Sequence, residues 1–338
     1  MIMTPIKYTS RKSQRGISLV EILIAMLLGL ILVGGVLQMF SSSRQTYRVH
    51  EATARMQESG RMALEVISRD IRMADFWGCA SDITNVVNNL DNAGAGFIDF
   101  GAGGLGGTNG AAGVPDTLLL RGGFNSGLGV EPPYGPQASA NIKVNAGNDL
   151  EQGDIMFVSD CTNADIFQVT NANPGGTGTI VHNTGSTTEP GNNNVSNPGC
   201  PGANAHCLSK VYGADASVFR VQEINYSIAV GSEGEPALFR NGDEFLDGIE
   251  DFQVLYGEDT DAPETAGFGI ANYYVPADQV VDMNTVVSIR FAVVARSQDD
   301  NLTGGANQTY DVLGEARTAP DQRLRQTYMS TVNIRNRM

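Results

Sequence analysis

The side chain with the most demanding chemistry in this sequence is Glu21, the only charged residue in the apolar run 17–40. An ionised carboxylate in an apolar environment is costly unless a cation pairs with it. In the first turn of a helix, however, the helix dipole favours a negative charge, and the cost near a membrane surface is lower than at its centre. Glu21 therefore predicts either a charge pair within an apolar assembly or an interfacial carboxylate at a helix start.

Signals for metal binding and for a nucleophile are weaker. Cys200, His206 and Cys207 could begin a zinc site, but the sequence offers no fourth ligand nearby. Histidine-assisted catalysis could draw only on three residues, and no nucleophile is marked beside His50, His182 or His206. We therefore predict no enzyme, no metal site and no cofactor.

Two further patterns, one of glycines and one of acids, could suggest a ligand. The spacing G-x-G-x-x-G occurs at 101–106, but a dinucleotide site needs a helix directly after it, and 108–115 has no helical pattern. Four acids lie close together at Glu258, Asp259, Asp261 and Glu264. Their spacing is not that of an EF-hand, so we expect a solvated acidic loop over 258–264 and keep calcium binding as the alternative.

The apolar run 17–40 is long enough, at about 1.5 Å per residue, to cross the hydrocarbon layer of a bilayer. Residues 1–16 contain four basic residues and no acid, which places this flank in the cytoplasm and the rest of the chain outside it. A cleaved secretory signal fits poorly, because the run is too long and 41–43 is a weak cleavage site. A plain signal anchor remains open but leaves Glu21 unexplained.

The segment 15–21, Arg-Gly-Ile-Ser-Leu-Val-Glu, resembles the processing site of the type IV prepilin family. The resemblance implies that 1–16 is a leader, that a prepilin peptidase cuts between Gly16 and Ile17, and that the new amine of Ile17 is methylated. It also implies that Glu21, as the fifth mature residue, faces the amine of an adjacent subunit. Ile17 stands where the family more often has Phe, a change the family tolerates.

A helical pattern continues beyond the apolar run to residue 78 without a proline. One face carries small and apolar residues at spacings of three or four, namely Gly60, Leu64, Ile67 and Ile71. We predict a single helix over 17–78 that ends at Gly78. Its part 17–40 would form the membrane and filament core, and its second half would pack against a sheet.

The remaining domain, 79–338, is rich in glycine and asparagine up to about 150 and then shows regular strand patterns. The predicted strands are 154–158, 165–170, 179–182, 217–228, 237–240, 252–256, 285–296 and 328–334. An Asn-Gly turn signal lies at 240–243. Because no βαβ rhythm follows, we predict a pilin-like α+β fold, with the long helix on a mainly antiparallel sheet with long loops.

Two stretches sharpen the resemblance. Residues 245–257, Phe-Leu-Asp-Gly-Ile-Glu-Asp-Phe-Gln-Val-Leu-Tyr-Gly, and residues 328–337 are similar to PilW-type minor pilins. The resemblance implies a structural subunit that primes pilus assembly at the pilus tip. Its implied partners are other minor pilins, the major pilin, the prepilin peptidase and the inner-membrane assembly platform. It also implies an inner-membrane protein with a periplasmic domain that later joins the pilus.

Four cysteines beyond the membrane run suggest disulfides, because the periplasm is oxidising. Three connectivities are possible. We favour Cys200 with Cys207, which closes a short Pro/Gly loop, and hence Cys79 with Cys161, which ties the helix end to the sheet.

The net charge of −15 argues against nucleic acid as a partner. Removal of the four basic leader residues would lower it to −19. Two rivals to the minor-pilin interpretation remain. A minor pseudopilin of type II secretion shares the leader and helix, and a signal-anchored periplasmic enzyme or binding protein would need a site that the sequence does not display.

Overall fold

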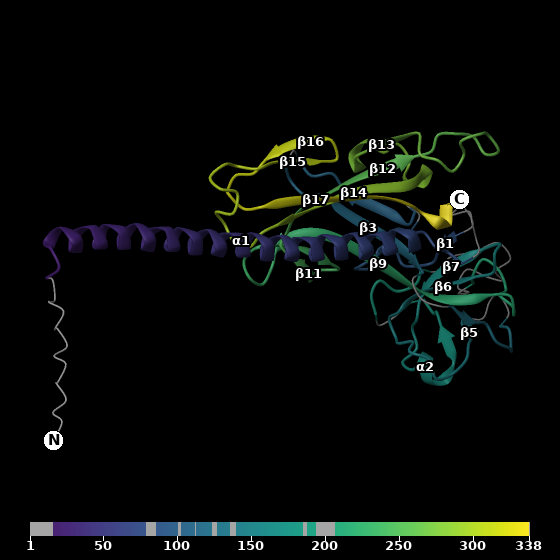
Figure 1. The fold of residues 1–338 in the computed structure, drawn as a ribbon. Helices are drawn as coiled ribbons and strands as arrows, with labels where there is room; N and C mark the ends of the chain where they lie inside the picture. Colours follow the sequence, from purple (N-terminus) through teal and green to yellow (C-terminus); the bar gives the residue numbers. More distant parts are fainter. Residues whose placement is uncertain are drawn as a thin grey trace, which may run out of the picture. The chain divides into compact units, whose positions relative to one another are not determined.

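The computed structural model describes residues 16–78, 86–100, 103–111, 113–123, 127–135, 140–184, 188–193 and 207–337. The chain divides into two compact units, Met1–Glu51 and Ala52–Met338. A long helix, α1 (Leu19–Met73), contributes to both units, and all of the described strands belong to the second (Figure 1). The predicted α+β fold is confirmed.

Helix α1 spans 55 residues and ends at Met73, five residues before the predicted terminator Gly78. The end is set by Asp75, whose φ of 60° is left-handed and cannot continue the helix. The Asp75 N–H donates to the Arg121 carbonyl at 2.8 Å, which commits the chain to the sheet instead. Gly78 also has a positive φ, 76°, but lies outside the helix.

The larger sheet has nine strands built around β9 (Ser217–Val230), which is 14 residues long. The first part of β9 pairs with β6 and β4, and its second part pairs with β3 and β10. The other strands extend this sheet: β1 (Val86–Asn88), β2 (Leu105–Thr108), β3 (Thr117–Gly123), β4 (Leu128–Gly129), β6 (Ile155–Ser159), β7 (Ala164–Gln168), β10 (Pro236–Arg240) and β11 (Asp243–Asp247). Among the described strands, only the pairing of β1 with β7 is parallel.

The second sheet has four antiparallel strands in the order β13 (Tyr273–Val275), β12 (Ile249–Glu258), β14 (Val286–Arg296) and β17 (Arg325–Asn333). Two smaller pairs complete the described strands: β15 (Thr309–Val312) with β16 (Glu315–Thr318), and β5 (Asn141–Lys143) with β8 (Thr179–Val181). Short helical turns lie at α2 (Pro174–Thr177), η3 (Ala277–Gln279), η4 (Met283–Thr285) and η5 (Arg335–Arg337).

The main core lies where the second part of α1 meets both sheets. Ala63, Ile67 and Ile71 of α1 are fully buried against strands of both sheets. Their strand partners include Leu120, Ile224, Leu238, Phe252, Phe291 and Val332. The predicted helix stripe and its packing on a sheet are therefore correct.

Each of the eight predicted strands overlaps an observed strand, with ends displaced by at most three residues. The Asn-Gly signal is also confirmed, because Asn241 and Gly242 have φ values of 57° and 84° in the turn between β10 and β11. Nine of the described strands were not predicted. Eight of them are pieces of two to five residues, which carry too little periodicity: β1, β2, β4, β5, β11, β13, β15 and β16. The ninth, β3, has seven residues, but its Leu-Leu-Leu run does not alternate.

Candidate assembly site

The N-terminal end of the described chain presents Gly16 and Ile17 as exposed residues directly before α1. Ser18 and Glu21 then form a reciprocal pair. The Ser18 N–H donates to Glu21 Oε2 at 3.0 Å, and the Glu21 N–H donates to Ser18 Oγ at 3.2 Å. This is a capping box, in which each side chain satisfies a backbone donor at the helix start. The single chain therefore gives the Glu21 carboxylate a local partner.

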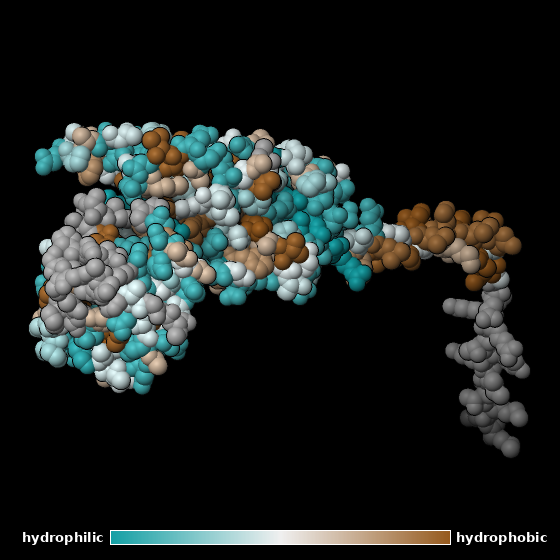
Figure 2. Space-filling model, turned by 180° about the vertical axis from the view of Figure 1, so that it is seen from behind, coloured by the Kyte–Doolittle hydropathy of each residue, from teal (hydrophilic) through white to brown (hydrophobic). Residues whose placement is uncertain are grey.

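The apolar part of α1 has no cover within its own unit. Every residue from Ile17 to Phe40 is exposed, and Figure 2 shows hydrophobic side chains gathered around this part of the helix. By length and composition α1 can cross a membrane, and it is the one such helix among the described residues. Two dozen exposed residues, most of them apolar, are too many for a helix in water, so this part requires either lipid or other helices.

A buried charged clamp joins the second part of α1 to the larger sheet. Asp70 is 4% exposed, and its Oδ2 accepts hydrogen bonds from Tyr226 Oη at 2.6 Å and from Arg240 Nη2 at 3.0 Å. Burial, followed by the hydrogen bond to Asp70, raises the pKa of Tyr226, so the phenol stays protonated as a donor. The clamp fixes α1 on strands β9 and β10.

A second polar contact fixes the end of α1 to the C-terminal segment. Asp75 Oδ1 accepts from the Trp77 indole N–H and from the Gly104 N–H, both at 2.8 Å. The Arg337 guanidinium pairs with the other oxygen of Asp75, and Arg337 Nη1 also donates to the Val286 carbonyl at 2.9 Å. Arg337 belongs to the stretch 328–337 that resembles PilW-type minor pilins, and it binds the residue that ends α1.

The stretch 245–257 contains the end of β11, the turn at Gly248 and nearly all of β12. Gly248 has a φ of 70°, which the turn from β11 requires. Ile249 and Phe252 then enter the main core and are fully buried. Between them, Glu250 and Asp251 carry carboxylates that pair with arginines from later strands.

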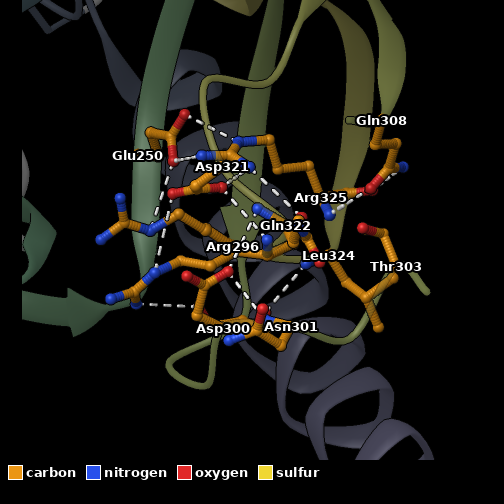
Figure 3. A network of polar contacts seen from close by, with 12 residues as sticks. Glu250, Arg296, Asp300, Asn301, Thr303, Gln308, Asp321, Gln322, Leu324 and Arg325 are labelled. Atoms are coloured by element: carbon orange, nitrogen blue, oxygen red, sulfur yellow. Dashed lines mark hydrogen bonds and ion pairs between the residues drawn. The ribbon is translucent and has the colours of Figure 1, made fainter. Parts of the chain in front are cut away.

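Glu250 belongs to a network of ion pairs around Arg325 of β17 (Figure 3). The Arg325 side chain is completely buried, and its Nε and Nη2 donate to the two oxygens of Glu250 at 3.0 and 2.9 Å. Its Nη1 donates to Asp321 Oδ1 at 2.6 Å. Burial by itself lowers the pKa of Arg325, but the bonds to Asp321 and Glu250 raise it by more. The net shift of the pKa is upward, so the guanidinium remains charged. Arg296 of β14 lies 3.3 Å from the same Glu250 carboxylate.

The network also fixes the backbone around β17. Gln308 accepts from the Arg325 N–H at 2.8 Å and donates to the Arg325 carbonyl at 2.7 Å. The Gln322 carbonyl accepts from the Leu302 N–H at 2.9 Å, and the Gln322 N–H donates to Asp300 at 3.1 Å. These bonds tie the loops that contain Asp300, Gln308 and Gln322 to one another and to the start of β17.

The other predicted site residues are placed as follows. Cys161 and Cys207 are both disulfide-bonded. Cys79 and Cys200 lie outside the described residues, so the pairing remains a prediction. Of the histidines, His50 is exposed on α1, His182 packs at 5.0 Å from the Phe167 ring, and His206 lies outside the described residues.

The glycine pattern at 101–106 leads into strand β2, which pairs with β3, so the helix that a dinucleotide site needs does not follow. Gly101 itself lies outside the described residues. The acidic loop differs from the prediction, because Glu258 and Asp259 are 1% and 7% exposed and bind backbone N–H groups. Within the described ranges, no three His, Cys, Asp or Glu side chains are grouped to hold a metal ion.

Sequence reasoning missed the Asp70 clamp and the Arg325 network. A signal for the first was present, since Asp70 interrupts the buried face of the helix and such a charge needs a partner. No comparable signal marked Arg325, because its two carboxylate partners lie 75 residues before it and four residues before it.

Comparison with known families adds two matches. Residues 225–336 match the family model described as Type IV Pilus-assembly protein W, and residues 11–37 match the Prokaryotic N-terminal methylation motif. The first range contains the Glu250–Arg325 network, and the second contains the Ser18–Glu21 capping box. No curated protein and no solved structure matches the chain.

Proposed function

We propose that this chain, whose two family matches support a minor pilin of a type IV pilus, acts as a non-enzymatic subunit that primes pilus assembly. The prediction of a prepilin-like minor pilin is confirmed at the level of these matches. The single observation that carries the proposal is the helix start, where Gly16, a capped Glu21 and an uncovered apolar helix follow one another inside the methylation-motif match.

Processing is the first step of the proposed function. A prepilin peptidase cleaves between Gly16 and Ile17, and the new amine of Ile17 is methylated. Both residues are exposed and precede the helix, so the scissile peptide is accessible and unconstrained by helical hydrogen bonds. The mature chain keeps its apolar helix in the inner membrane and its β-rich domain in the periplasm.

Assembly is the second step. In a bundle of such helices, the Glu21 carboxylate exchanges its bond to the Ser18 N–H for the cationic amine of a neighbouring subunit. A buried charge pair is favourable only when both partners are present, so it also fixes the register between subunits. The neighbours are other minor pilins and the major pilin, recruited at the inner-membrane platform, and the complex lies at the pilus tip.

The rival pseudopilin of type II secretion shares the helix start, so only the domain separates the two. The match over 225–336 favours the pilus and does not favour the alternative. A membrane-anchored enzyme would need a catalytic site. The polar clusters among the described residues are instead ion pairs that hold one element of the fold against another.

The proposal is tested by deleting the gene and complementing it with the wild-type chain. Pilus number should fall on deletion and recover on complementation, while secreted proteins stay unchanged. Mass spectrometry of the mature protein should show Ile17, methylated, at the amino terminus. Gly16→Val should leave the precursor in the membrane, whereas the control Gly34→Val, within the helix, should be cleaved normally. A terminus at Met1 in piliated cells would contradict the proposal.

A further inference from the structure

The segment between β12 and β14 exposes four large side chains with apolar surface. Phe268, Ile270, Tyr273 and Val281 are 49%, 66%, 39% and 87% exposed. Tyr273 lies in β13, and its hydroxyl bonds the Glu258 carboxylate. We call these four residues the apolar rim.

Two consecutive buried carboxylates at the end of β12 hold the backbone of the apolar rim. Glu258 Oε1 accepts from the N–H of Val281 at 3.1 Å and from that of Asp282 at 3.2 Å. Glu258 is also the register partner of Tyr273 in the pairing of β12 with β13. Asp259 Oδ2 accepts from the Gly269 N–H, between Phe268 and Ile270, at 2.5 Å. Val281 is therefore bonded to Glu258 directly, and Tyr273 is the partner of Glu258 in the sheet. Phe268 and Ile270 flank Gly269, which is bonded to Asp259.

Further bonds make the segment rigid. Asn272 Oδ1 accepts from the Thr260 N–H at 2.7 Å, and Asn272 Nδ2 donates to Asp261 at 3.1 Å. Buried carboxylates are costly unless they make such bonds. Using them to hold exposed apolar side chains in place does nothing for the core, so the arrangement indicates a preformed contact surface.

The charge around the apolar rim restricts its partner. Residues 258–285 contain six acidic residues and no Lys, Arg or His. Four of these acids are at the surface, namely Asp261, Glu264, Asp278 and Asp282. A second copy of the same surface would bring like charges together, and an anionic bilayer would repel it. A protein surface with an apolar pocket bordered by Lys and Arg is complementary in both respects.

We propose that the apolar rim is a docking surface for a different protein, one whose apolar pocket is bordered by basic side chains. Phe268 and Ile270 enter the pocket, Tyr273 and Val281 close its edge, and the surface acids face the basic border. This inference goes beyond the proposed function, in which only the helix start makes contacts between subunits.

The test places a photo-crosslinking amino acid at position 281 of the full-length chain in the cells that produce it. The matched control position is Val230, the last residue of β9, which is 72% exposed and is followed by a turn that contains Glu233. Crosslinked products are digested, and the partner peptide is identified by mass spectrometry. We expect a product at 281 and none of the same mass at 230, with Lys or Arg inside the crosslinked partner peptide when the digestion uses a protease that cuts at acidic residues.

Two variants establish which chemistry forms the contact. Phe268→Ser combined with Ile270→Ser should reduce the crosslinked product at least tenfold, because large apolar anchors dominate such contacts. Glu264→Lys should also reduce it, whereas Glu233→Lys should not. Crosslinks from position 281 to phospholipid, to a second copy of this chain or to nothing would each overturn the proposal. So would a product that survives the double serine variant while the chain remains folded and cleaved at Gly16.

Discussion

Gly60 of α1 lies directly against the ring of Tyr328 in β17. A Cβ atom placed on Gly60 would come within 2.3 Å of two ring carbons of Tyr328, which is far inside van der Waals contact. The two residues are 268 positions apart, yet the helix can approach the sheet at this point only because Gly60 has no side chain. The packing therefore requires a residue without a side chain at position 60, even though glycine weakens a helix.

Gly60→Ala should therefore lower the free energy of unfolding by up to about 2 kcal/mol, since the overpacking cost of about 1–3 kcal/mol is offset by a gain in helix propensity of about 1 kcal/mol. Urea unfolding of the detergent-solubilised full chain measures this. In a Tyr328→Ala background the ring is gone, and the same Gly60→Ala change should become stabilising. An unchanged sign in that background would show that ring contact is not the cause.

The Asp70 clamp should be worth more than a surface ion pair. Asp70→Ala leaves Tyr226 and Arg240 without their acceptor and should cost about 2–4 kcal/mol of unfolding free energy. The value lies below that of a fully buried pair because the Arg240 side chain is 32% exposed and water screens it. Glu65→Ala, on the exposed face of the same helix, should change stability by less than about 0.5 kcal/mol. Equal losses from both variants would contradict the clamp.

Arg325 should be intolerant of substitution because its charge neutralises two carboxylates at once. Arg325→Met removes the bonds to Glu250 and Asp321, while Arg296 stays near Glu250. The variant should cost about 3 kcal/mol, the lower end of the range for a broken buried pair, with loss of folded protein in cells. Arg325→Lys should recover only part of this, since an ammonium cannot bond both oxygens of Glu250 in the same fork. The control is Arg290→Met, whose guanidinium stacks at 3.9 Å on Tyr274 without a carboxylate partner among its described bonds.

Asp160 should make part of the stability depend on pH. Burial raises its pKa, but bonds from Lys210, Thr162 and Asn163 outweigh burial and lower the pKa from 3.8 to about 2. Because the folded pKa lies below the unfolded one, this stabilisation is present above about pH 4 and is lost as the pH falls towards 2.

The difference in unfolding free energy between the wild-type chain and Asp160→Asn should therefore be about 2 kcal/mol at pH 6 and should shrink as the pH falls from 4 to 2. Unfolding curves at pH 6, 4, 3 and 2 measure it. Asp278→Asn serves as the control, since Asp278 is an exposed acid. A difference that stays constant across this range would show that Asp160 acts through its shape and not its charge.

Glu21→Gln separates helix capping from charge pairing. Glutamine can take the same place in a capping box, so the bond with Ser18 should remain while the charge is lost. The variant should be cleaved after Gly16 but should fail to restore pili in the deletion strain, as should Glu21→Ala. Ser18→Ala, which removes half of the cap and keeps the charge, should restore them. Normal piliation by Glu21→Gln would remove the charge pair from the proposed assembly step.

The local elements were predictable because each depends on its own residues. The apolar run and the basic flank define the start of α1, and the eight predicted strands carry their own β-branched alternation. The resemblance at 245–257 could be identified from the sequence, but the partners of its carboxylates could not. The arginines that bind Glu250 and Asp251 come from β14, β16 and β17.

The sequence by itself determined the membrane-length helix, the approximate positions of eight strands and the two segments that match family models, since these depend on spacing along the chain. Only the tertiary structure decided that Glu258 and Asp259 are buried anchors and not a solvated loop, that Gly60 faces Tyr328, and that Asp70 meets Arg240. These relationships join residues that are distant in sequence, and a side chain's burial and partner depend on which strands the fold brings together.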